Sequence, residues 1–436
     1  MRTLIIMLLC LCIGYNAEAQ TMEATIDARL QAFFSNYTTV NATIGNCKLE
    51  RTEIDHQKKQ LTIYANKNFG YQPFTEENIA AIYRSVKQIL PGPTNYYKLC
   101  IVTDGKAIED LIPVAIQKGS RDRSRTWHPH VDYKGNPWVS NLSRPYEISK
   151  GLGNRHLAVW QSHGRYFSNK KNEWIWQRPR LFCTTEDLFT QSIVVPYLIP
   201  MLENAGAVVF TPRERDWQRN EVIVDNNSRG GKSIYLEENY RKNHWQEIKD
   251  KGFAQRYATY PDGHNPFKDG TARYISTIRK KDKAFAQWIP DIPETGKYAV
   301  YVSYVTLSNS VSDAKYLVFH KGGVTEFSVN QKMGEGTWVY LGSFEFDKGV
   351  NDYGMVALSN ESSENGVVTA DAVRFGGGMG NITRSGTTSG MPRFLEGARY
   401  WGQWAGMPYE VYSKSQGQND YNDDINARSL MVNYLN

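Results

Sequence analysis

Residues 222–375 carry the strongest structural constraint in this sequence, a series of short runs in which apolar and polar residues alternate. Turn signals such as Lys321-Gly322-Gly323 and Asp347-Lys348-Gly349 separate the runs, and helical periodicity is absent. Short alternating strands at this spacing predict an antiparallel β-sandwich. The predicted strands cover residues 285–289, 297–305, 315–319, 325–329, 338–346 and 355–358.

A strand–helix–strand pattern precedes this region, between residues 155 and 216. An apolar strand over residues 156–160 runs into Gln161-Ser162-His163-Gly164, and Thr184 or Thr185 is placed to cap a long helix. A second apolar strand follows over residues 207–210. This order predicts a right-handed crossover and a parallel sheet. The helix is expected to bury Leu188, Val195, Leu198 and Leu202, and to kink or split at Pro196 and Pro200.

The remaining segments have mixed patterns. Residues 20–110 predict a small α/β module, and residues 111–154 are polar and turn-rich, which predicts a linker or loop region. The His128-Pro129-His130-Val131-Asp132 motif in that region could hold a metal, but we favour a solvated loop. Helices are expected over residues 23–34, 75–90, 394–404 and 423–435, and strands over residues 60–65 and 97–102.

The helical periodicity also predicts which faces are apolar. The helix over residues 23–34 is expected to bury Ile26, Leu30 and Phe33. The helix over residues 423–435 is expected to carry an apolar face made of Ile425, Leu430, Val432 and Leu435.

The first residues indicate export. Arg2 precedes an apolar run from Leu4 to Ile13, and Ala17-Glu18-Ala19 offers small residues at a cleavage site. The run is too short to cross a bilayer core of about 30 Å, so a signal peptide over residues 1–19 is preferred to a core helix or a lipoprotein signal. The protein is therefore expected in the periplasm, at the cell surface or secreted. Cys47 and Cys100 could pair in such an oxidising compartment.

Charge and composition narrow the class of partner. The net charge is +6, a mild excess that favours an anionic wall polymer or a membrane surface. The basic residues are spread too evenly to indicate nucleic acid. The 27 Tyr and 11 Trp residues offer flat, amphipathic surfaces that suit sugar rings as well as protein cores. No stretch after the N-terminal run is apolar for long enough to predict a transmembrane helix.

His163 and Glu186 are the candidate metal ligands. His163 follows a predicted strand at the end of the sheet where ligand sites of α/β proteins form, and Glu186 begins the next helix. An imidazole nitrogen and a carboxylate oxygen are good zinc ligands, and a catalytic zinc ion lowers the pKa of its bound water to about 7. The alternative is a structural role, since the helix dipole alone favours Glu at this position.

The stretch from His156 to Asp216 resembles the catalytic domain of zinc-dependent N-acetylmuramoyl-L-alanine amidases. The matching text is Trp160-Gln161-Ser162-His163-Gly164, then Glu186, then residues 203–211, with Arg213 and Asp216 near the positions of the T-R-x-x-D motif. The resemblance implies Zn²⁺ held by His163, Glu186 and a third ligand, with Arg165 and Arg213 as substrate-binding candidates. The third ligand, a His, and the catalytic Glu of the family are expected beyond residue 436, so the chain is interpreted as truncated or as a pseudoenzyme.

Residues 222–375 resemble the golvesin-like, or xanthan-lyase-type, carbohydrate-binding domain. The matching text includes Ala286-Gln287-Trp288-Ile289-Pro290, residues 296–302 and residues 368–375. Trp288 and Trp338 alternate with strand residues and are expected in the sandwich core rather than on a sugar-binding surface.

The two resemblances imply a multidomain fold, in which a small α/β module precedes an α/β amidase-like twisted sheet. That sheet, over residues 155–221 and 381–436, is expected to be interrupted by the inserted antiparallel β-sandwich. The implied function is an exported zinc-dependent amidase that cleaves between N-acetylmuramic acid and L-alanine in peptidoglycan and holds a cell-surface glycan. The alternatives are a non-catalytic carbohydrate-binding protein or pseudoenzyme and, third, a protein related to polysaccharide lyases.

Overall fold

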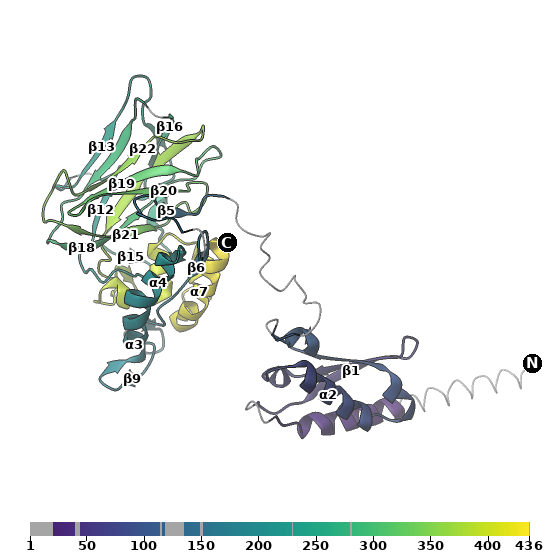
Figure 1. The fold of residues 1–436 in the computed structure, drawn as a ribbon. Helices are drawn as coiled ribbons and strands as arrows, with labels where there is room; N and C mark the ends of the chain where they lie inside the picture. Colours follow the sequence, from purple (N-terminus) through teal and green to yellow (C-terminus); the bar gives the residue numbers. More distant parts are fainter. Residues whose placement is uncertain are drawn as a thin grey trace, which may run out of the picture. The chain divides into compact units, whose positions relative to one another are not determined.

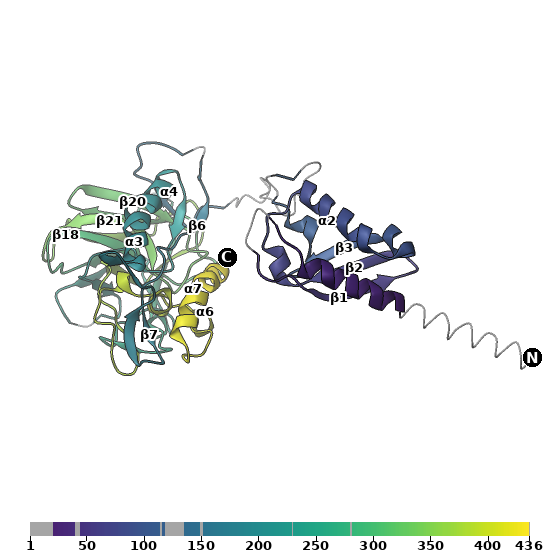
Figure 2. The same cartoon turned by 90° about the horizontal axis from the view of Figure 1, so that it is seen from below.

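The computed structural model describes residues 21–39, 44–113, 116–117, 135–148, 151–228, 230–279 and 281–435. The chain divides into two compact units, residues 1–132 and residues 133–436, and each has its own hydrophobic core (Figures 1 and 2). The predicted signal peptide and the His128–Asp132 motif lie outside the described residues. Among the helices of the described ranges, none combines the length and apolar character that a bilayer crossing requires.

The first unit is the predicted α/β module. Its sheet has the order β1-β2-β3-β4, in which β2 and β3 are parallel and the outer pairs are antiparallel. Cys47 is buried, Cys100 is partly buried, and both thiols are free. The disulfide that these two residues could form is therefore absent from the structure. The elements are a helix over residues 21–35, β1 (Leu49–Asp55), β2 (Gln60–Ala65), η1 (Lys67–Gly70), α2 (Glu76–Ile89), η2 (Gly92–Tyr96), β3 (Lys98–Thr103), β4 (Lys106–Ala107) and η3 (Ile108–Leu111).

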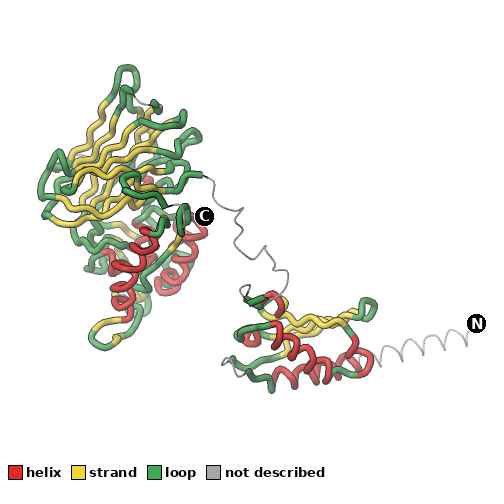
Figure 3. The backbone as a smooth tube through the Cα atoms, viewed as in Figure 1, coloured by secondary structure: helices red, strands yellow, loops and turns green. Residues whose placement is uncertain are grey.

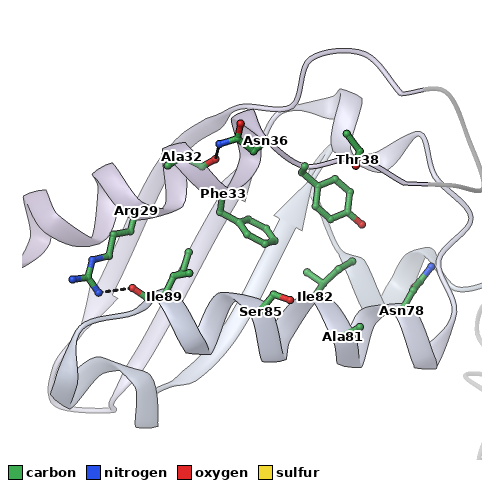
Figure 4. Close-up of a pocket in the computed structure, with 11 residues that line it drawn as sticks. Arg29, Ala32, Phe33, Asn36, Thr38, Asn78, Ala81, Ile82, Ser85 and Ile89 are labelled. Atoms are coloured by element: carbon green, nitrogen blue, oxygen red, sulfur yellow. Dashed lines mark hydrogen bonds between the residues drawn. The ribbon is translucent and has the colours of Figure 1, made fainter.

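The helices of this unit lie side by side over one face of the sheet (Figures 3 and 4). Thr75 begins α2 with a reciprocal capping box, in which its hydroxyl accepts from the backbone of Asn78 at 3.2 Å. At the other end, the Arg29 guanidinium donates to the carbonyl of Ile89 at 2.7 Å. The third buried residue of the first helix is Phe34. The predicted Phe33 is only partly buried, because it faces the groove between the helices.

The second unit contains the predicted sandwich. A six-stranded sheet, β13-β17-β22-β19-β20-β5, packs on a four-stranded sheet, β12-β24-β18-β21, and every pair within them is antiparallel. A third sheet has the order β14-β16-β23. The strands are β5 (Val139–Asn141), β12 (Val222–Asp225), β13 (Ile234–Glu238), β14 (Gln246–Ile248), β16 (Ala272–Ser276), β17 (Phe285–Ile289), β18 (Gly296–Val302), β19 (Ala314–His320), β20 (Gly323–Val329), β21 (Val339–Phe346), β22 (Met355–Ser359), β23 (Val367–Ala370) and β24 (Ala372–Phe375).

The four-stranded sheet is the middle of three layers. Because side chains alternate across a strand, Val300 and Val302 of β18 face the sandwich core, whereas Ala299 and Tyr301 face a second core beneath the C-terminal helices. Figure 3 shows these helices together on one side of the strands. Trp288 is buried in the sandwich core, as expected from the sequence, whereas Trp338 is buried in the second core beneath the C-terminal helices.

Residues 135–148 belong to the sandwich, although their polar composition predicts a loop. β5 extends the six-stranded sheet by pairing with β20. The Trp138 side chain enters the core and donates from its indole nitrogen to the Tyr304 hydroxyl at 2.7 Å. This segment therefore fixes the start of the second unit.

The strand–helix–strand pattern forms beneath the sandwich. β6 (His156–Ala158) and β11 (Val208–Phe210) pair in parallel, as predicted. Within the described residues, this sheet consists of these two strands. Two strands alone do not establish an amidase-like fold, which stays a prediction. Between them lie β7 (Arg165–Ser168), β8 (Glu173–Trp176), β9 (Arg180–Leu181), β10 (Thr184–Thr185), α3 (Glu186–Ile193), the π-helical segment η6 (Val194–Leu198) and α4 (Ile199–Asn204).

The two prolines split the long helix, as predicted. α3 ends at Ile193, and the π-helical turns contain Pro196. The wider π-helical turn changes which residues face inward, so the predicted buried residue Leu198 is 41% exposed. The helix instead buries Ile199.

The C-terminal segment is helical, but its buried face differs from the prediction. In α7 (Asp420–Leu435) the buried residues include Asp423, Asp424 and Arg428, whereas Ile425 is 43% exposed. The reason is the buried Arg399, whose guanidinium lies 3.5 Å from Asp423 and 3.6 Å from Asp420. The other elements here are η7 (Pro266–Lys268), η8 (Arg393–Leu395), α5 (Ala398–Trp404), α6 (Tyr409–Tyr412) and the parallel pair β15 (Tyr260–Pro261) and β25 (Ile382–Thr383).

Candidate functional site

His163 lies in the loop between β6 and β7, at the carboxyl end of the parallel pair. Ser162 precedes it with a φ of +64°, and the Ser162 hydroxyl lies 2.8 Å from Nδ1 of the imidazole. The left-handed turn is thus made by Ser162. Gly164 is required for a different reason, because a Cβ there would lie 2.6 Å from the Arg213 guanidinium and from the Glu396 carbonyl carbon.

The guanidinium of Arg178 lies between His163 and Glu186. Its Nη2 is 3.2 Å from Nε2 of His163, and its Nε is 3.9 Å from the Glu186 carboxylate. The strand end and the helix start therefore place the imidazole and the carboxylate around the same guanidinium. The group that both contact is a cationic side chain from the loop after β8, which sequence reasoning missed.

Asp187 is a second residue that sequence reasoning missed. It follows Glu186 in the first turn of α3 and is fully buried. One carboxylate oxygen accepts from the backbone of Arg178 at 3.1 Å, and the other lies 3.8 Å from Nδ1 of His163. Burial raises the pKa of Asp187 to about 6.

The C-terminal helix α7 supplies further charges. Burial first, and then the Arg428 and Arg178 guanidinium groups, lower the pKa of His163 to about 4, so its imidazole is neutral at pH 7. Asp424 of the same helix acts on His163 in the opposite direction. The neutral imidazole can accept a hydrogen bond from the Arg178 guanidinium, which lies 3.2 Å from Nε2.

These residues fit a catalytic zinc ion only in part. Such an ion needs three protein ligands and an open position. Within the described ranges, no group of three or more His, Cys, Asp or Glu residues is arranged to hold a metal ion, and Arg178 already contacts both predicted ligands. The assignment of Zn²⁺ to His163 and Glu186 therefore stays a prediction.

The two predicted substrate-binding arginines both bind backbone. Arg213 is buried and donates to the carbonyls of Gln161, His163, Phe394 and Glu396, so it ties the His163 loop to the segment before α5. Arg165 donates to the Trp174 carbonyl at 2.5 Å and lies 5.6 Å from the Trp176 ring. Their role toward a substrate stays a prediction.

A groove of about 1040 Å³ lies elsewhere on the second unit, where the helical layer meets the sandwich. We call it the tryptophan groove, after Trp217, whose side chain is 46% exposed on its wall. The lining residues come from the helix between β10 and β11, from the loop before β12, from the turn before β18, and from β18 and β21: Val195, Pro196, Pro200, Glu203, residues 215–220, Glu294, Lys297, Tyr340 and Ser343.

Arg215 is one of the residues that line the tryptophan groove. Its guanidinium binds the Glu203 carboxylate through two contacts of 2.7 and 3.0 Å and stacks 3.8 Å from the Tyr340 ring. This arrangement joins α4 to β21 across the groove. A rigid concave surface with an exposed indole and several polar groups is suited to binding a sugar ring.

Comparisons with known proteins identify part of the sandwich. Residues 260–377 match the Golvesin C-terminal domain. Xanthan lyase from Bacillus sp. (strain GL1) is 35% identical over 88 residues, which are 20% of this chain and 9% of the lyase. The solved structure of Paenibacillus xanthan lyase aligns with 36% of this chain and 13% of its own, at 24% identity and a TM-score of 0.27. The family match and the 35% identity to the Bacillus xanthan lyase confirm the predicted resemblance of the sandwich to golvesin and xanthan-lyase domains. The matched segment is a small part of the lyase.

Proposed function

We propose that this protein is exported and binds polysaccharide, and that its second unit holds the glycan in the tryptophan groove. The observation that carries the proposal is the position of the matched domain. Residues 260–377 contribute Glu294, Lys297, Tyr340 and Ser343 to the wall of the groove. The similarity to part of a xanthan lyase supports a polysaccharide ligand.

The groove is a better candidate for glycan binding than the faces of the sandwich. The sandwich tryptophans are buried, so their rings contact protein rather than solvent. Trp217 is exposed on the groove wall, and Gln218 and Asn220 also line the groove. An indole face with neighbouring hydrogen-bonding groups is the chemistry that a sugar ring requires.

The experiment is co-sedimentation of the full chain, without residues 1–19, with a panel of insoluble glycans that includes purified peptidoglycan, chitin and cellulose. Soluble polysaccharides are added as competitors. We expect saturable retention that at least one soluble glycan competes. If no glycan in the panel retains the protein and none binds in solution, the proposed function is wrong.

A second candidate is the zinc-dependent peptidoglycan amidase, and the placement of His163 and Glu186 in one region, beside the end of the parallel strand pair, favours it. The described residues bring too few metal ligands together for a catalytic zinc ion, so we derive no reaction from them. Elemental analysis of the purified chain and release of peptides from cell wall test this candidate, with His163→Ala as the matched variant. Stoichiometric zinc that is lost in the variant would support it.

A further inference from the structure

The segment that carries Arg178 is tied by its backbone on both sides. The residue before Arg178 donates to the Gly164 carbonyl at 3.3 Å, and the residue after it accepts from the backbone of Glu186 at 3.5 Å. The backbone of Arg178 itself donates to the buried Asp187 carboxylate at 3.1 Å. Gly164 belongs to the loop between β6 and β7, whereas Glu186 and Asp187 begin α3. The main chain of Arg178 is therefore fixed between the two elements that supply the predicted metal ligands.

The guanidinium of Arg178 covers both nitrogen atoms of the His163 imidazole. Its Nε lies 3.4 Å from Nδ1, and its Nη2 lies 3.2 Å from Nε2. Nδ1 also contacts the Ser162 hydroxyl at 2.8 Å. A zinc ion binds an imidazole through one of these nitrogens, at a distance of about 2.0–2.1 Å. Neither nitrogen can bind a metal ion while the guanidinium stays in this position.

The guanidinium of Arg178 also carries the positive charge that a metal ion would bring. Its Nε lies 3.9 Å from the Glu186 carboxylate, so a single cation contacts both predicted ligands. The other guanidinium groups around this site are engaged elsewhere. Arg213 donates to backbone carbonyls, and Arg428 lies 3.6 Å from Asp424 of its own helix. Arg178 is therefore the cation that the two predicted ligands share.

A buried oxygen at this site lacks a hydrogen-bond partner. It is Oδ1 of Asp187, whose side chain is 1% exposed, and it lies 3.8 Å from Nδ1 of His163. With the imidazole and the Glu186 carboxylate, this oxygen makes a set of three possible zinc donors. As the described residues fold, no three such groups are placed to hold a metal ion together. Each of the three donors instead contacts Arg178.

We infer that the guanidinium of Arg178 takes the place of a metal cation at this site, so that the folded chain excludes Zn²⁺ from His163 and Glu186. The guanidinium supplies the positive charge and joins the strand end to the helix start. Its removal opens a site for Zn²⁺ made of His163, Glu186 and Asp187. This site is separate from the tryptophan groove, and the inference does not depend on glycan binding.

The test is calorimetric titration of Zn²⁺ into the full chain without residues 1–19 and into Arg178→Ala. We expect the variant to bind Zn²⁺ at least about tenfold more tightly than the unmodified chain, because a positive charge no longer repels the metal ion. The double variant His163→Ala/Arg178→Ala should lose this gain, which assigns the binding to this site. Urea unfolding shows whether each variant is folded, and Arg178→Gln gives the same comparison if Arg178→Ala is not.

Arg180→Ala is the matched control. It removes the same charge from an exposed position two residues further along the chain, and it should leave Zn²⁺ binding unchanged. Equal affinity of the folded Arg178 variant and the unmodified chain for Zn²⁺ would overturn the inference. Stoichiometric Zn²⁺ in the unmodified chain that is lost in His163→Ala would also overturn it, and would support the amidase candidate. Neither result decides whether the tryptophan groove binds glycan.

Discussion

The guanidinium of Arg374 lies 2.7 Å from the carboxylate of Glu214, and both side chains are fully buried. Arg374 belongs to β24 of the middle sheet, whereas Glu214 belongs to the segment that follows β11. The same guanidinium stacks 3.8 Å from the Tyr301 ring, and the Tyr301 hydroxyl donates to Glu214. This buried network attaches the helical layer to the sandwich and thereby fixes both walls of the tryptophan groove.

Removing one member of this pair should destabilise the second unit strongly. Arg374→Met leaves the Glu214 carboxylate buried without its partner, which typically costs about 3–5 kcal/mol in the free energy of unfolding. Urea denaturation followed by tryptophan fluorescence measures this, since all tryptophans except Trp127 lie in the second unit.

The control for this prediction is Arg241→Met, which removes the exposed pair with Asp282. Exposed pairs contribute little, so this variant should unfold near the urea midpoint of the unmodified chain. Equal effects of the two substitutions would contradict the view that the buried pair joins the layers.

Gly164→Ala should also destabilise the second unit. A Cβ at this position would lie 2.6 Å from atoms of Arg213 and Glu396, and the backbone of Glu396 cannot move away easily. Overpacking of this kind costs about 1–3 kcal/mol. Gly296→Ala is the matched control, because a Cβ there meets its nearest neighbour at an ordinary 3.8 Å. Thermal unfolding of the two variants side by side measures the difference, and similar melting temperatures would refute the close packing at Gly164.

The buried carboxyl of Glu396 predicts a pH dependence. Burial raises its pKa from 4.5 to about 7, while the Ser389 hydroxyl donates to it at 2.5 Å. The Glu396 carboxyl ionises near pH 4.5 in the unfolded chain and only near pH 7 in the folded chain. The contribution of the protonated carboxyl to the free energy of unfolding is therefore present at low pH and is lost as the pH rises through this window. The unmodified chain should therefore become less stable relative to Glu396→Gln between pH 4.5 and pH 7.

Unfolding in urea across this range tests the sign of the effect. Glu345→Gln, at an exposed position on β21, shows what removal of a surface carboxylate does. The account is contradicted if the difference in the free energy of unfolding between the unmodified chain and Glu396→Gln stays constant across this range. It is also contradicted if the unmodified chain becomes more stable relative to the variant as the pH rises.

The sequence predicts six strands of the sandwich because apolar and polar residues alternate there and turn residues separate the runs. Residues 285–289 form β17 with the predicted bounds, and the other predicted strands differ only at their ends. The predicted strands do not include β12, β13, β14, β16, β23 and β24. β5 also escapes prediction, because it has three residues in a polar segment and is fixed by its pairing with β20. The inward face of α7 is also hidden from periodicity, since buried charges there are stabilised by Arg399, a residue of α5.

The candidate zinc site, too, is predictable from the sequence only in part. The positions of His163 after a strand and of Glu186 at a helix start follow from the order of the elements, and both residues contact Arg178. Arg178 reaches them from an irregular loop after the β7–β8 hairpin, and no periodic pattern places such a loop. Trp217 lies in a segment without helical or strand pattern, and its exposure depends on contacts of its neighbours with β18.

The central claim is that a glycan stacks on Trp217 in the tryptophan groove. Calorimetric titration with the tightest-binding polysaccharide tests it, by comparing Trp217→Ala with Trp160→Ala, which removes another exposed indole that does not line the groove. Loss of a stacking indole costs about 1–3 kcal/mol of affinity, roughly 5- to 150-fold in Kd. We expect this loss in Trp217→Ala and unchanged affinity in Trp160→Ala. Unchanged affinity in Trp217→Ala, with the fold intact, would contradict the account.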